Sequence, residues 1–260
     1  MRFSIITCTY NSEKFLRENL ESVKKQTFKD LEHIFIDGFS YDKTKEIIFE
    51  YKKSVQYPVY FFQHPPKGIA DAFNKGIYAS NGEYLFFLNS DDYFYDENVL
   101  RDINNFLQKN PEYDWIYGLV SVIQLDGKTI GKWPRHWYLH YSYKNIFGKY
   151  FLKYFNFIPH QGVFIKREIF KKFGLFDENL KYLCDAEYWL RIRSKTKWTF
   201  VNRTIANYRW GGATEQNLLE AWKIYFNIQK KYSNFFELLL IRIFNKIIFI
   251  KQTLNHMRQF

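Results

Sequence analysis

A short apolar run that ends in two adjacent carboxylates is the feature that most constrains this chain. Residues Tyr84–Leu88 form an unbroken apolar run, and Asn89-Ser90-Asp91-Asp92 follow it directly. A run of this length predicts a strand that is buried on both faces, as in a parallel sheet. Two unpaired aspartates at its end would repel each other and lose hydration. A divalent cation would remove both costs, because Mg²⁺ and Mn²⁺ favour oxygen ligands and commonly also bind substrate phosphates.

A helix cap is the simpler interpretation of the same carboxylates. Asp91 or Asp92 could cap a helix over Glu97–Asn110, since aspartate is a favoured N-cap residue. A cap needs only one of the two, however, and ligands of open α/β sheets bind at the carboxyl ends of the strands. The pair therefore predicts a metal–nucleotide site at this strand end.

Composition limits the classes of partner without choosing among them. The chain has 260 residues, which suits one domain or one domain with an appendage. Its 38 basic and 27 acidic residues give a net charge of +11, which favours nucleic acid, phosphorylated substrates or an acidic membrane face. Cys8 and Cys184 fit no metal pattern and are expected to remain reduced thiols. The apolar run after Met1 is too short for a signal peptide, so we expect a cytoplasmic protein.

Strand and helix patterns alternate over residues 3–110. Apolar runs predict the strands, and i, i+4, i+7 spacing, as in Leu16, Leu20 and Val23, predicts the helices. Because the alternation repeats at βαβ lengths, we expect an α/β fold with a mostly parallel sheet and right-handed crossovers. The predicted strands are Phe3–Cys8, Leu31–Ile36, Pro58–Phe62 and Tyr84–Leu88, and the predicted helices run from Asn11 or Ser12 to Gln26 and over Asp42–Lys53, Ile69–Ser80 and Glu97–Asn110.

The pattern changes after Pro111. Trp115–Gln124 and Thr129–Trp133 flank Asp126-Gly127, which predicts a hairpin. Residues 133–157 are aromatic, basic and irregular, as in a loop over a binding face. A strand over Gln161–Ile165 and a helix over Cys184–Arg193 follow, and from Thr214 onward the chain is expected to be helical.

Potential ligand residues follow three of the predicted strands. They are Thr7 to Asn11 after the first, Asp37 after the second, and the Asp91-Asp92 pair after the fourth. The carboxyl ends of parallel strands lie side by side, so these residues should share one crevice. The chain has neither GxGxxG in its first turn nor GxxxxGK[ST] anywhere, which argues against dehydrogenases, P-loop kinases and pyrophosphorylases. Without a glycine-rich loop for a diphosphate, a metal must supply the positive charge.

Six further segments carry recognisable short motifs. They are Ile5-Ile6-Thr7-Cys8-Thr9-Tyr10-Asn11, Ile36-Asp37-Gly38-Phe39-Ser40-Tyr41-Asp42, Gly68-Ile69-Ala70-Asp71-Ala72-Phe73-Asn74-Lys75-Gly76, Phe87-Leu88-Asn89-Ser90-Asp91-Asp92, Pro159-His160-Gln161, and Phe176-Asp177-Glu178 with Cys184-Asp185-Ala186-Glu187-Tyr188-Trp189-Leu190-Arg191. In this order they resemble the successive motifs of family 2 glycosyltransferases, which are inverting enzymes of GT-A fold. The resemblance covers roughly residues 3–213. It implies a GT-A domain over 1–213, with a nucleotide-sugar-binding half (1–110) and an acceptor half (111–213), and a C-terminal helical extension over 214–260.

The resemblance also implies a role for each matching residue. Asp91 would bind Mn²⁺ or Mg²⁺, with Asp92 beside the sugar or the metal, and Asp185 would be the catalytic base. The remaining roles are base and ribose contacts for Thr7, Tyr10 and Glu13, a base contact for Asp37, a donor ribose or sugar contact for Asp71, and an acceptor contact for His160. The chain departs from the family pattern at Asn89, where the first DxD aspartate is expected, and at Cys184, where an acidic residue commonly precedes the base.

Several of these residues also have simpler interpretations. Asp37 could begin an Asp-Gly turn, Asp71 could be a first-turn carboxylate favoured by the helix dipole, and Asp185 could be an N-cap. His160 could be a structural histidine. His136 and His140 have i, i+4 spacing but no neighbouring carboxylate, which disfavours a metal site. Gly211-Gly212 could be either a hinge for a loop over the donor or a simple turn.

The C-terminal run Phe235–Ile250 is apolar but interrupted by charged and polar residues. It is too short and too polar to span a bilayer. An interfacial helix, with Lys246, Lys251 and Arg258 near anionic headgroups, and a helix packed on the domain or on a second subunit both remain open.

The expected function is an inverting, metal-dependent glycosyltransferase of bacterial surface polysaccharide synthesis. Its donor would be a UDP-sugar and its acceptor a saccharide or polyprenyl-linked saccharide, with peripheral contact to the inner membrane face and no nucleic-acid partner. The alternative is a non-enzymatic RNA or single-strand binder that uses the basic and aromatic surface. That alternative does not explain why aspartates follow successive strands in a basic protein.

Overall fold

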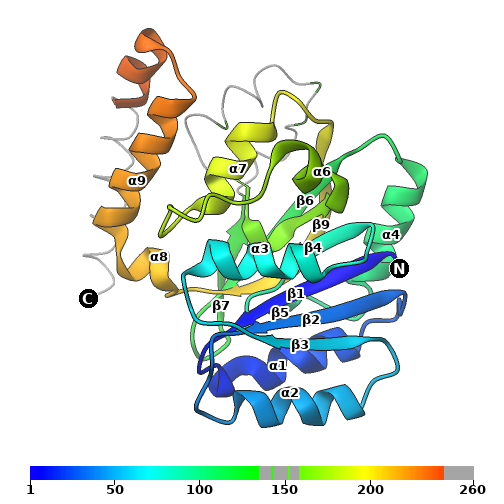
Figure 1. Cartoon of the computed structure of the whole chain (residues 1–260). Coiled ribbons are helices and arrows are strands. Elements are labelled where there is room, and N and C mark those ends of the chain that lie inside the picture. The colour runs from blue at the N-terminus through cyan, green and yellow to red at the C-terminus, as the bar shows by residue number, and fades with distance from the viewer. Residues whose placement is uncertain (135–141, 143, 145–151, 153–157, 243–260) are drawn as a thin grey trace.

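Alternating strands and helices build the first part of the molecule (Figure 1). The computed structural model describes residues 1–134, 142, 144, 152 and 158–242. The first elements in chain order are β1 (Phe3–Thr9), α1 (Glu13–Lys24), β2 (Leu31–Asp37), α2 (Thr44–Lys53), β3 (Val59–Gln63), α3 (Ile69–Ala79), β4 (Tyr84–Phe87), β5 (Tyr93–Phe94) and α4 (Val99–Lys109).

The second part of the chain adds the hairpin, further strands and the C-terminal helices. After α4 come β6 (Trp115–Ile123), β7 (Thr129–Trp133), a 3₁₀ helix η2 (His160–Gly162), β8 (Val163–Lys166), α6 (Arg167–Phe173), α7 (Cys184–Ile192), β9 (Trp198–Arg209), α8 (Ala213–Gln216) and α9 (Leu218–Lys231). A further helix covers residues 235–242. The predicted hairpin is confirmed, and the predicted C-terminal helices are confirmed as far as residue 242, beyond which the chain lies outside the described residues. β5, β9 and α6 were not predicted.

One nine-stranded sheet joins both parts. Its order is β3-β2-β1-β4-β8-β6-β9-β5, with β7 paired to β6. β1, β2, β3 and β4 are mutually parallel, as predicted, whereas β8 is antiparallel to both β4 and β6. β9 runs parallel to β6 and antiparallel to β5. The residues that follow β4 therefore lie where the parallel part of the sheet meets the mixed part.

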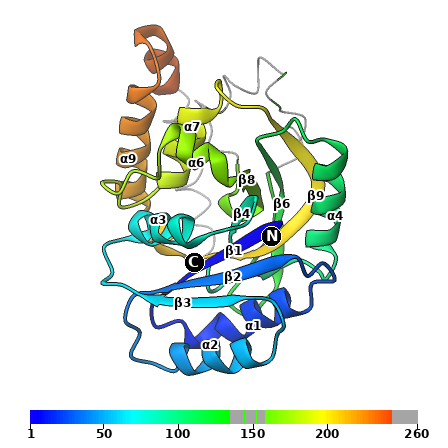
Figure 2. The ribbon, with the colours of Figure 1, turned by 45° about the vertical axis from the view of Figure 1, so that its right-hand side comes forward.

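Alternation along each strand sends side chains to two different helical layers. Ile6 on β1 packs with Phe73 and Ile77 of α3, whereas Phe35 on β2 packs with Leu16 and other residues of α1 and α2. In Figure 2, α1 and α2 lie on one side of β1–β3 and α3 lies on the other. The parallel part of the sheet is therefore the middle of three layers, with helices on both of its faces.

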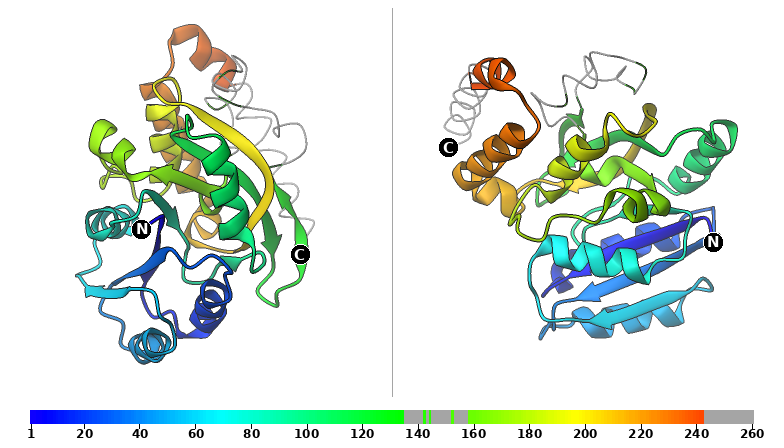
Figure 3. Two further views of the ribbon diagram at one scale, coloured as in Figure 1. Left: turned by 90° about the vertical axis from the view of Figure 1, so that its right-hand side faces the viewer. Right: turned by 45° about the horizontal axis from the view of Figure 1, so that its top comes forward.

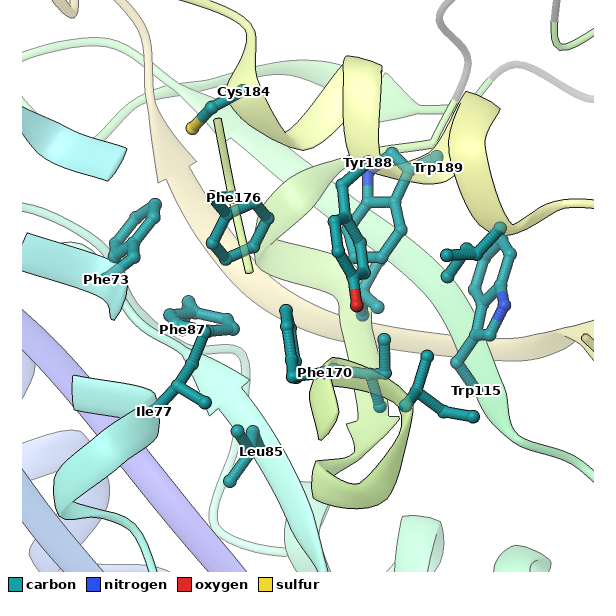
Figure 4. Packing of buried hydrophobic residues seen from close by; sticks show 14 of the residues in the cluster. Phe73, Ile77, Leu85, Phe87, Trp115, Phe170, Phe176, Cys184, Tyr188 and Trp189 are labelled. Carbon is teal, nitrogen blue, oxygen red and sulfur yellow. The ribbon is translucent and has the colours of Figure 1, made fainter. Parts of the chain in front are cut away.

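Aromatic side chains fill the core between α3, β4 and α7. Phe87 lies 5.5 Å from Phe176 between ring centroids, and Trp115 stacks on Trp189 at 5.3 Å (Figure 4). Large aromatic rings bury much apolar surface each, so this cluster fixes α7 against the sheet. α9 and the helix over 235–242 stand at one end of the molecule, away from α1 and α2 (Figure 3).

Candidate active site

The loops after β1, β2 and β4 are connected directly at the carboxyl end of the sheet. The hydroxyl oxygens of Ser12 and Ser90 lie 2.9 Å apart, which joins the start of α1 to the turn after β4. The side-chain amide of Asn19 donates to the carbonyls of Asn89 and Asp92 at 2.8 and 3.0 Å. α1 thus holds the turn that carries Asp91 and Asp92, and the segments that follow β1 and β4 adjoin at this edge of the sheet.

Asp91 and Asp92 have different environments. Asp91 is partly exposed, whereas Asp92 is 1% exposed. One carboxylate oxygen of Asp92 accepts a hydrogen bond from the backbone N–H of Arg209 at 2.8 Å, and the other accepts one from Asn89 Nδ2 at 3.1 Å. Burial and then the charge of Asp91 raise the pKa of Asp92 well above its usual value, while these hydrogen bonds oppose the shift.

This carboxylate pair suits a divalent cation. Across the described ranges, no group of three or more His, Cys, Asp or Glu side chains is placed to bind a metal by itself. Mg²⁺ and its relatives are, however, commonly held by one or two carboxylates together with substrate phosphates. A cation beside Asp91 would also offset the repulsion that raises the pKa of Asp92. The donor set therefore fits a metal that arrives with a nucleotide diphosphate.

Thr7, for which the sequence predicts a nucleotide contact, has its side chain inside the sheet. Thr7 is fully buried, and its hydroxyl donates to the carbonyl of Leu88 at 2.8 Å and lies 3.0 Å from Nε2 of His33. The reason is strand alternation, because Thr7 shares a face with Phe3 and Ile5 rather than with the crevice. Its role is to tie β1 to the end of β4.

Asp37, for which the sequence predicts a base contact, lies at the end of β2. Asp37 is fully buried, and its carboxylate accepts four hydrogen bonds, which is about the capacity of its lone pairs. The donors are Thr9 Oγ1 at 2.8 Å, Ser40 N at 2.9 Å, Ser40 Oγ at 2.5 Å and Gln63 Nε2 at 3.1 Å. Asp37 thus orders the turn after β2, as in its simpler interpretation, and its contact with a base stays a prediction.

Tyr10 and Glu13 lie at the surface above these buried residues. Tyr10 is exposed, and its ring packs so closely on Gly38 that an added Cβ there would lie 3.1 Å from Tyr10 Cδ2. Glu13 is exposed and accepts a hydrogen bond from the backbone N–H of Lys43 at 3.0 Å. The structure therefore keeps both side chains where a nucleotide could reach them.

Backbone strain is concentrated around the same crevice. In the part of the chain that the structure describes, the non-glycine residues with positive φ are Asn11 (50°), Phe39 (60°) and Leu183 (61°). Asn11 follows β1, Phe39 follows β2, and Leu183 precedes the helix that carries Asp185. Such conformations cost about 1–3 kcal/mol each and tend to occur at functional sites. Gly211, with φ of 111°, makes a turn before α8, and the structure does not test the hinge alternative.

Asp71 and Asp185 approach the crevice from α3 and α7. Asp71 forms an ion pair with Lys75. Burial, and to a lesser extent the negative charge of Asp71, raises the pKa of the Cys8 thiol near the end of β1. Asp185 lies in the first turn of α7 and is partly exposed. Asn74 of α3 hydrogen-bonds to the backbone N–H and carbonyl of Phe176 at 3.0 Å each, which connects α3 to the loop before α7.

His160 lies between these elements. Its ring stacks on Phe73 at 4.9 Å and lies 5.4 Å from the ring of Phe87. Both ring nitrogens are buried without a hydrogen-bond partner in the structure. Burial lowers the pKa of His160, and the nearby charge of Asp185 acts in the opposite direction. The imidazole is therefore neutral, close to Asp185, and retains unused hydrogen-bonding capacity.

Glu187 has a structural environment that differs from that of Asp185. It is almost fully buried and binds Arg191, Tyr232 and Lys231, the last at 3.3 Å. Hydrogen bonds from Arg191 and Tyr232 lower its pKa despite burial, which acts in the opposite sense. Glu187 therefore joins α7 to the end of α9. His136 and His140 lie outside the described residues.

Three residues near the carboxylate pair were not predicted from the sequence: Asn19, Gln161 and Arg209. Gln161 hydrogen-bonds to the Asp92 carboxylate through its side chain. Arg209 lies within an unpredicted strand and carried no local signal. The one available hint was the polar Asn19 on the apolar face defined by Leu16, Leu20 and Val23.

Comparison with solved structures defines the fold class as GT-A. The chain aligns with S. aureus TarS 1-349 in complex with UDP-GlcNAc (TM-score 0.67, 20% identity, 88% of this chain and 65% of that one). It also aligns with the mannosyltransferase PcManGT of Pyrobaculum calidifontis in complex with GDP-Man and Mn²⁺ (TM-score 0.67, 13% identity, 94% of this chain and 69% of that one). The predicted α/β GT-A fold is therefore confirmed.

The sequence comparisons identify the family. The model described as Glycosyl transferase family 2 matches residues 4–174, and the chain belongs to this family. Similar proteins include an uncharacterized glycosyltransferase of Rickettsia typhi (31% identity over 73% of this chain and 58% of that protein) and a PGL/p-HBAD biosynthesis glycosyltransferase of Mycobacterium tuberculosis (27%, 84% and 80%). The chain thus spans little more than half of the Rickettsia relative. The predicted enzyme class, a glycosyltransferase, is confirmed at family level.

Proposed function

We propose that this protein is an inverting, metal-dependent glycosyltransferase that moves a sugar from a UDP-sugar to a saccharide or lipid-linked saccharide acceptor in surface polysaccharide synthesis. The observation that carries the proposal is the Asp91-Asp92 pair at the end of β4, with Asp185 on the neighbouring helix α7. Bound UDP-GlcNAc in TarS, and GDP-Man with Mn²⁺ in PcManGT, support the donor class and the metal.

On the donor side, Asp91 and Asp92 would hold Mn²⁺ or Mg²⁺ against the diphosphate. The cation would supply charge neutralisation for the departing diphosphate. Asp91 is the partly exposed partner, so it is the direct ligand in this proposal, while buried Asp92 is oriented by Arg209 and Asn89. Tyr10 and Glu13 would contact the nucleoside from the loop after β1, and Asp71 would contact the donor ribose or sugar from α3.

On the acceptor side, Asp185 would act as general base. It removes the proton from the acceptor hydroxyl as that oxygen bonds to the anomeric carbon. The bond from this carbon to the diphosphate oxygen breaks on the opposite face, and the diphosphate leaves with the electron pair. A single displacement of this kind inverts the anomeric configuration. His160, neutral and with free ring nitrogens, would hydrogen-bond to an acceptor hydroxyl.

A direct test is metal-dependent turnover of a panel of nucleotide sugars. Slow hydrolysis of a UDP-sugar that requires Mn²⁺ or Mg²⁺, and that is lost in Asp91→Ala, is the expected result. Thermal stabilisation by UDP with Mn²⁺ gives a second readout, because a ligand at 100-fold its Kd stabilises by about 2.7 kcal/mol. Stabilisation by single-stranded oligonucleotide, with none by any nucleotide–metal pair, would favour the nucleic-acid alternative instead.

The helix over 235–242 supports peripheral membrane contact as part of this proposal. No helix in the part of the chain that the structure describes is long and apolar enough to cross a bilayer. Phe235 and Phe236 are each 77% exposed, while Ile241 on the same helix is fully buried. Asn234 and Glu237 exchange two 2.9 Å hydrogen bonds in a capping box that fixes the start of this helix. The helix is thus anchored through one side and presents an aromatic surface on another.

Vesicle binding can test this contact without shortening the chain. Replacing Phe235 and Phe236 with Ser should reduce binding to anionic vesicles, because exposed aromatic rings insert into the interface. Phe49→Ser is the matched control, since this partly exposed ring lies on α2. Equal vesicle binding of all three proteins would reject membrane contact at this helix while leaving the catalytic proposal intact.

A further inference from the structure

Arg209, the last residue of β9, has a buried guanidinium that contacts three separate segments. Its side chain is 2% exposed. Nη2 binds Glu18 of α1 at 2.6 Å, Nε donates to the carbonyl of Asp91 at 3.1 Å, and Nη1 donates to the carbonyls of Gln124 and Leu125 at 3.3 and 3.1 Å. Most donors of this charged group are therefore satisfied by groups around the carboxylate pair.

The aromatic surroundings fix the same side chain further. The guanidinium carbon lies 4.0 Å from the centre of the Phe15 ring and 6.0 Å from that of Tyr93. Such cation–π contacts strengthen when the cation is shielded from water. Phe15 belongs to α1 and Tyr93 to β5, so the rings hold the guanidinium next to the Asp91 carbonyl.

The backbone of Arg209 hydrogen-bonds to the carboxylate of Asp92. Its N–H donates to Asp92 Oδ1 at 2.8 Å, while its side chain holds the carbonyl of Asp91. One residue thus restrains both members of the pair, from a strand that lies more than a hundred positions later in the chain. A planar guanidinium with several fixed donors can do this, whereas the single ammonium of lysine cannot reach the same set of acceptors.

We propose that Arg209 is a positioning residue that sets the geometry of Asp91 and Asp92 for the divalent cation. This inference rests on the proposed metal-dependent function. Arg209 itself does not bind the metal. Residues that orient metal ligands typically change metal affinity by about 10–100-fold when they are replaced.

The test compares two arginines of the same strand. Arg209→Gln removes the charge and most donors, and Arg203→Gln is the matched control. Arg203 is also on β9 and pairs with Asp96 and Asp102, the latter at 3.1 Å, away from the carboxylate pair. The free Mn²⁺ signal in electron paramagnetic resonance, recorded with UDP present, gives Mn²⁺ affinity without requiring turnover. Urea unfolding of each variant measures the loss of stability separately.

Arg209→Gln should weaken Mn²⁺ affinity by about 10–100-fold, and Arg203→Gln should lose stability with unchanged Mn²⁺ affinity. Should Arg209→Gln fail to fold, Arg209→Lys, which keeps the charge, should show a smaller weakening in the same direction. Parent-like Mn²⁺ affinity in the folded Arg209 variant, or equal weakening in both arginine variants, would overturn the inference. A parent protein that binds no Mn²⁺ with UDP would instead refute the proposed function itself.

Discussion

The side-chain amide of Asn19 donates a hydrogen bond to the carbonyl of Asp92 at 3.0 Å from the buried face of α1. The same amide holds the carbonyl of Asn89 at 2.8 Å. Asn19→Leu would conserve side-chain size but leave both carbonyls without this donor. We expect the free energy of unfolding to fall by about 1–3 kcal/mol, because unsatisfied buried acceptors are costly. Urea denaturation measures it, and a loss well below this range would show that other donors replace the amide.

Replacing the exposed partner of the carboxylate pair should separate stability from metal binding. Asp91→Asn removes one of two adjacent negative charges, so the metal-free protein should be as stable as the parent or slightly more stable. The same change should abolish the Mn²⁺ dependence of UDP binding. Calorimetry of UDP with and without Mn²⁺, on both proteins, checks this expectation. Equal UDP affinity in all four combinations would reject the metal assignment.

Neutralising Asp185 should lower turnover, whereas neutralising Glu187 should lower stability. Asp185→Asn should lower turnover by about 10²–10⁴-fold with little change in UDP affinity, since general-base catalysis has that magnitude. Glu187 lies roughly 200° around the same helix and cannot replace it.

Glu187→Gln should mainly lower the melting temperature, because Arg191 and Lys231 would lose their shared carboxylate. Its turnover per folded molecule should remain near that of the parent. Steady-state kinetics together with thermal unfolding distinguish the two variants. An exchange of outcomes would identify Glu187 as the base.

His33 should make stability depend on pH. The Thr7 hydroxyl donates to Leu88, so Nε2 of His33 must donate to Thr7, and Nδ1 accepts from the Tyr51 hydroxyl at 2.9 Å. Burial lowers the pKa of His33 to about 3 from 6.5. Between these values the unfolded chain binds a proton that the folded protein does not. The unfolding free energy should therefore fall as pH decreases through this window, by about 1.4 kcal/mol per pH unit.

The comparison protein is His33→Gln. Between pH 6.5 and pH 5, the parent should lose about 1.6 kcal/mol more stability than this variant. Urea titrations at both pH values provide the measurement. Parallel losses in the two proteins would mean that His33 is already protonated in the folded state or does not titrate in this window.

Local sequence patterns predicted the parallel strands well because each is a short apolar run with a clear end. The strand Tyr84–Phe87 and the position of the carboxylates after it could be predicted from neighbouring residues alone. The direction of individual side chains was harder. Thr7 lies on the face shared with Phe3 and Ile5, and the motif resemblance did not indicate which face its side chain occupies.

Features that the sequence did not indicate depend on contacts between distant parts of the chain. The carboxylate of Asp37 accepts hydrogen bonds from β1, from β3 and from its own turn. These donors are far apart in the sequence, so no local pattern predicts that they meet at Asp37. Arg209 reaches Asp92 across 117 positions. Its contacts with the aspartate pair could be inferred only once the pairing of β9 with β6 and β5 was known.

The pairing of β9 with β5 has a consequence for synthesis of the chain. The aspartates are made early, but Asp92 obtains its hydrogen bond from Arg209 only after β9 has been translated and has docked. Contacts of such large sequence separation form slowly, because long loops must close first. A nascent chain that has emerged only as far as residue 110 therefore carries both carboxylates before Arg209 is available to orient them, so the final geometry of the pair is reached only late in translation.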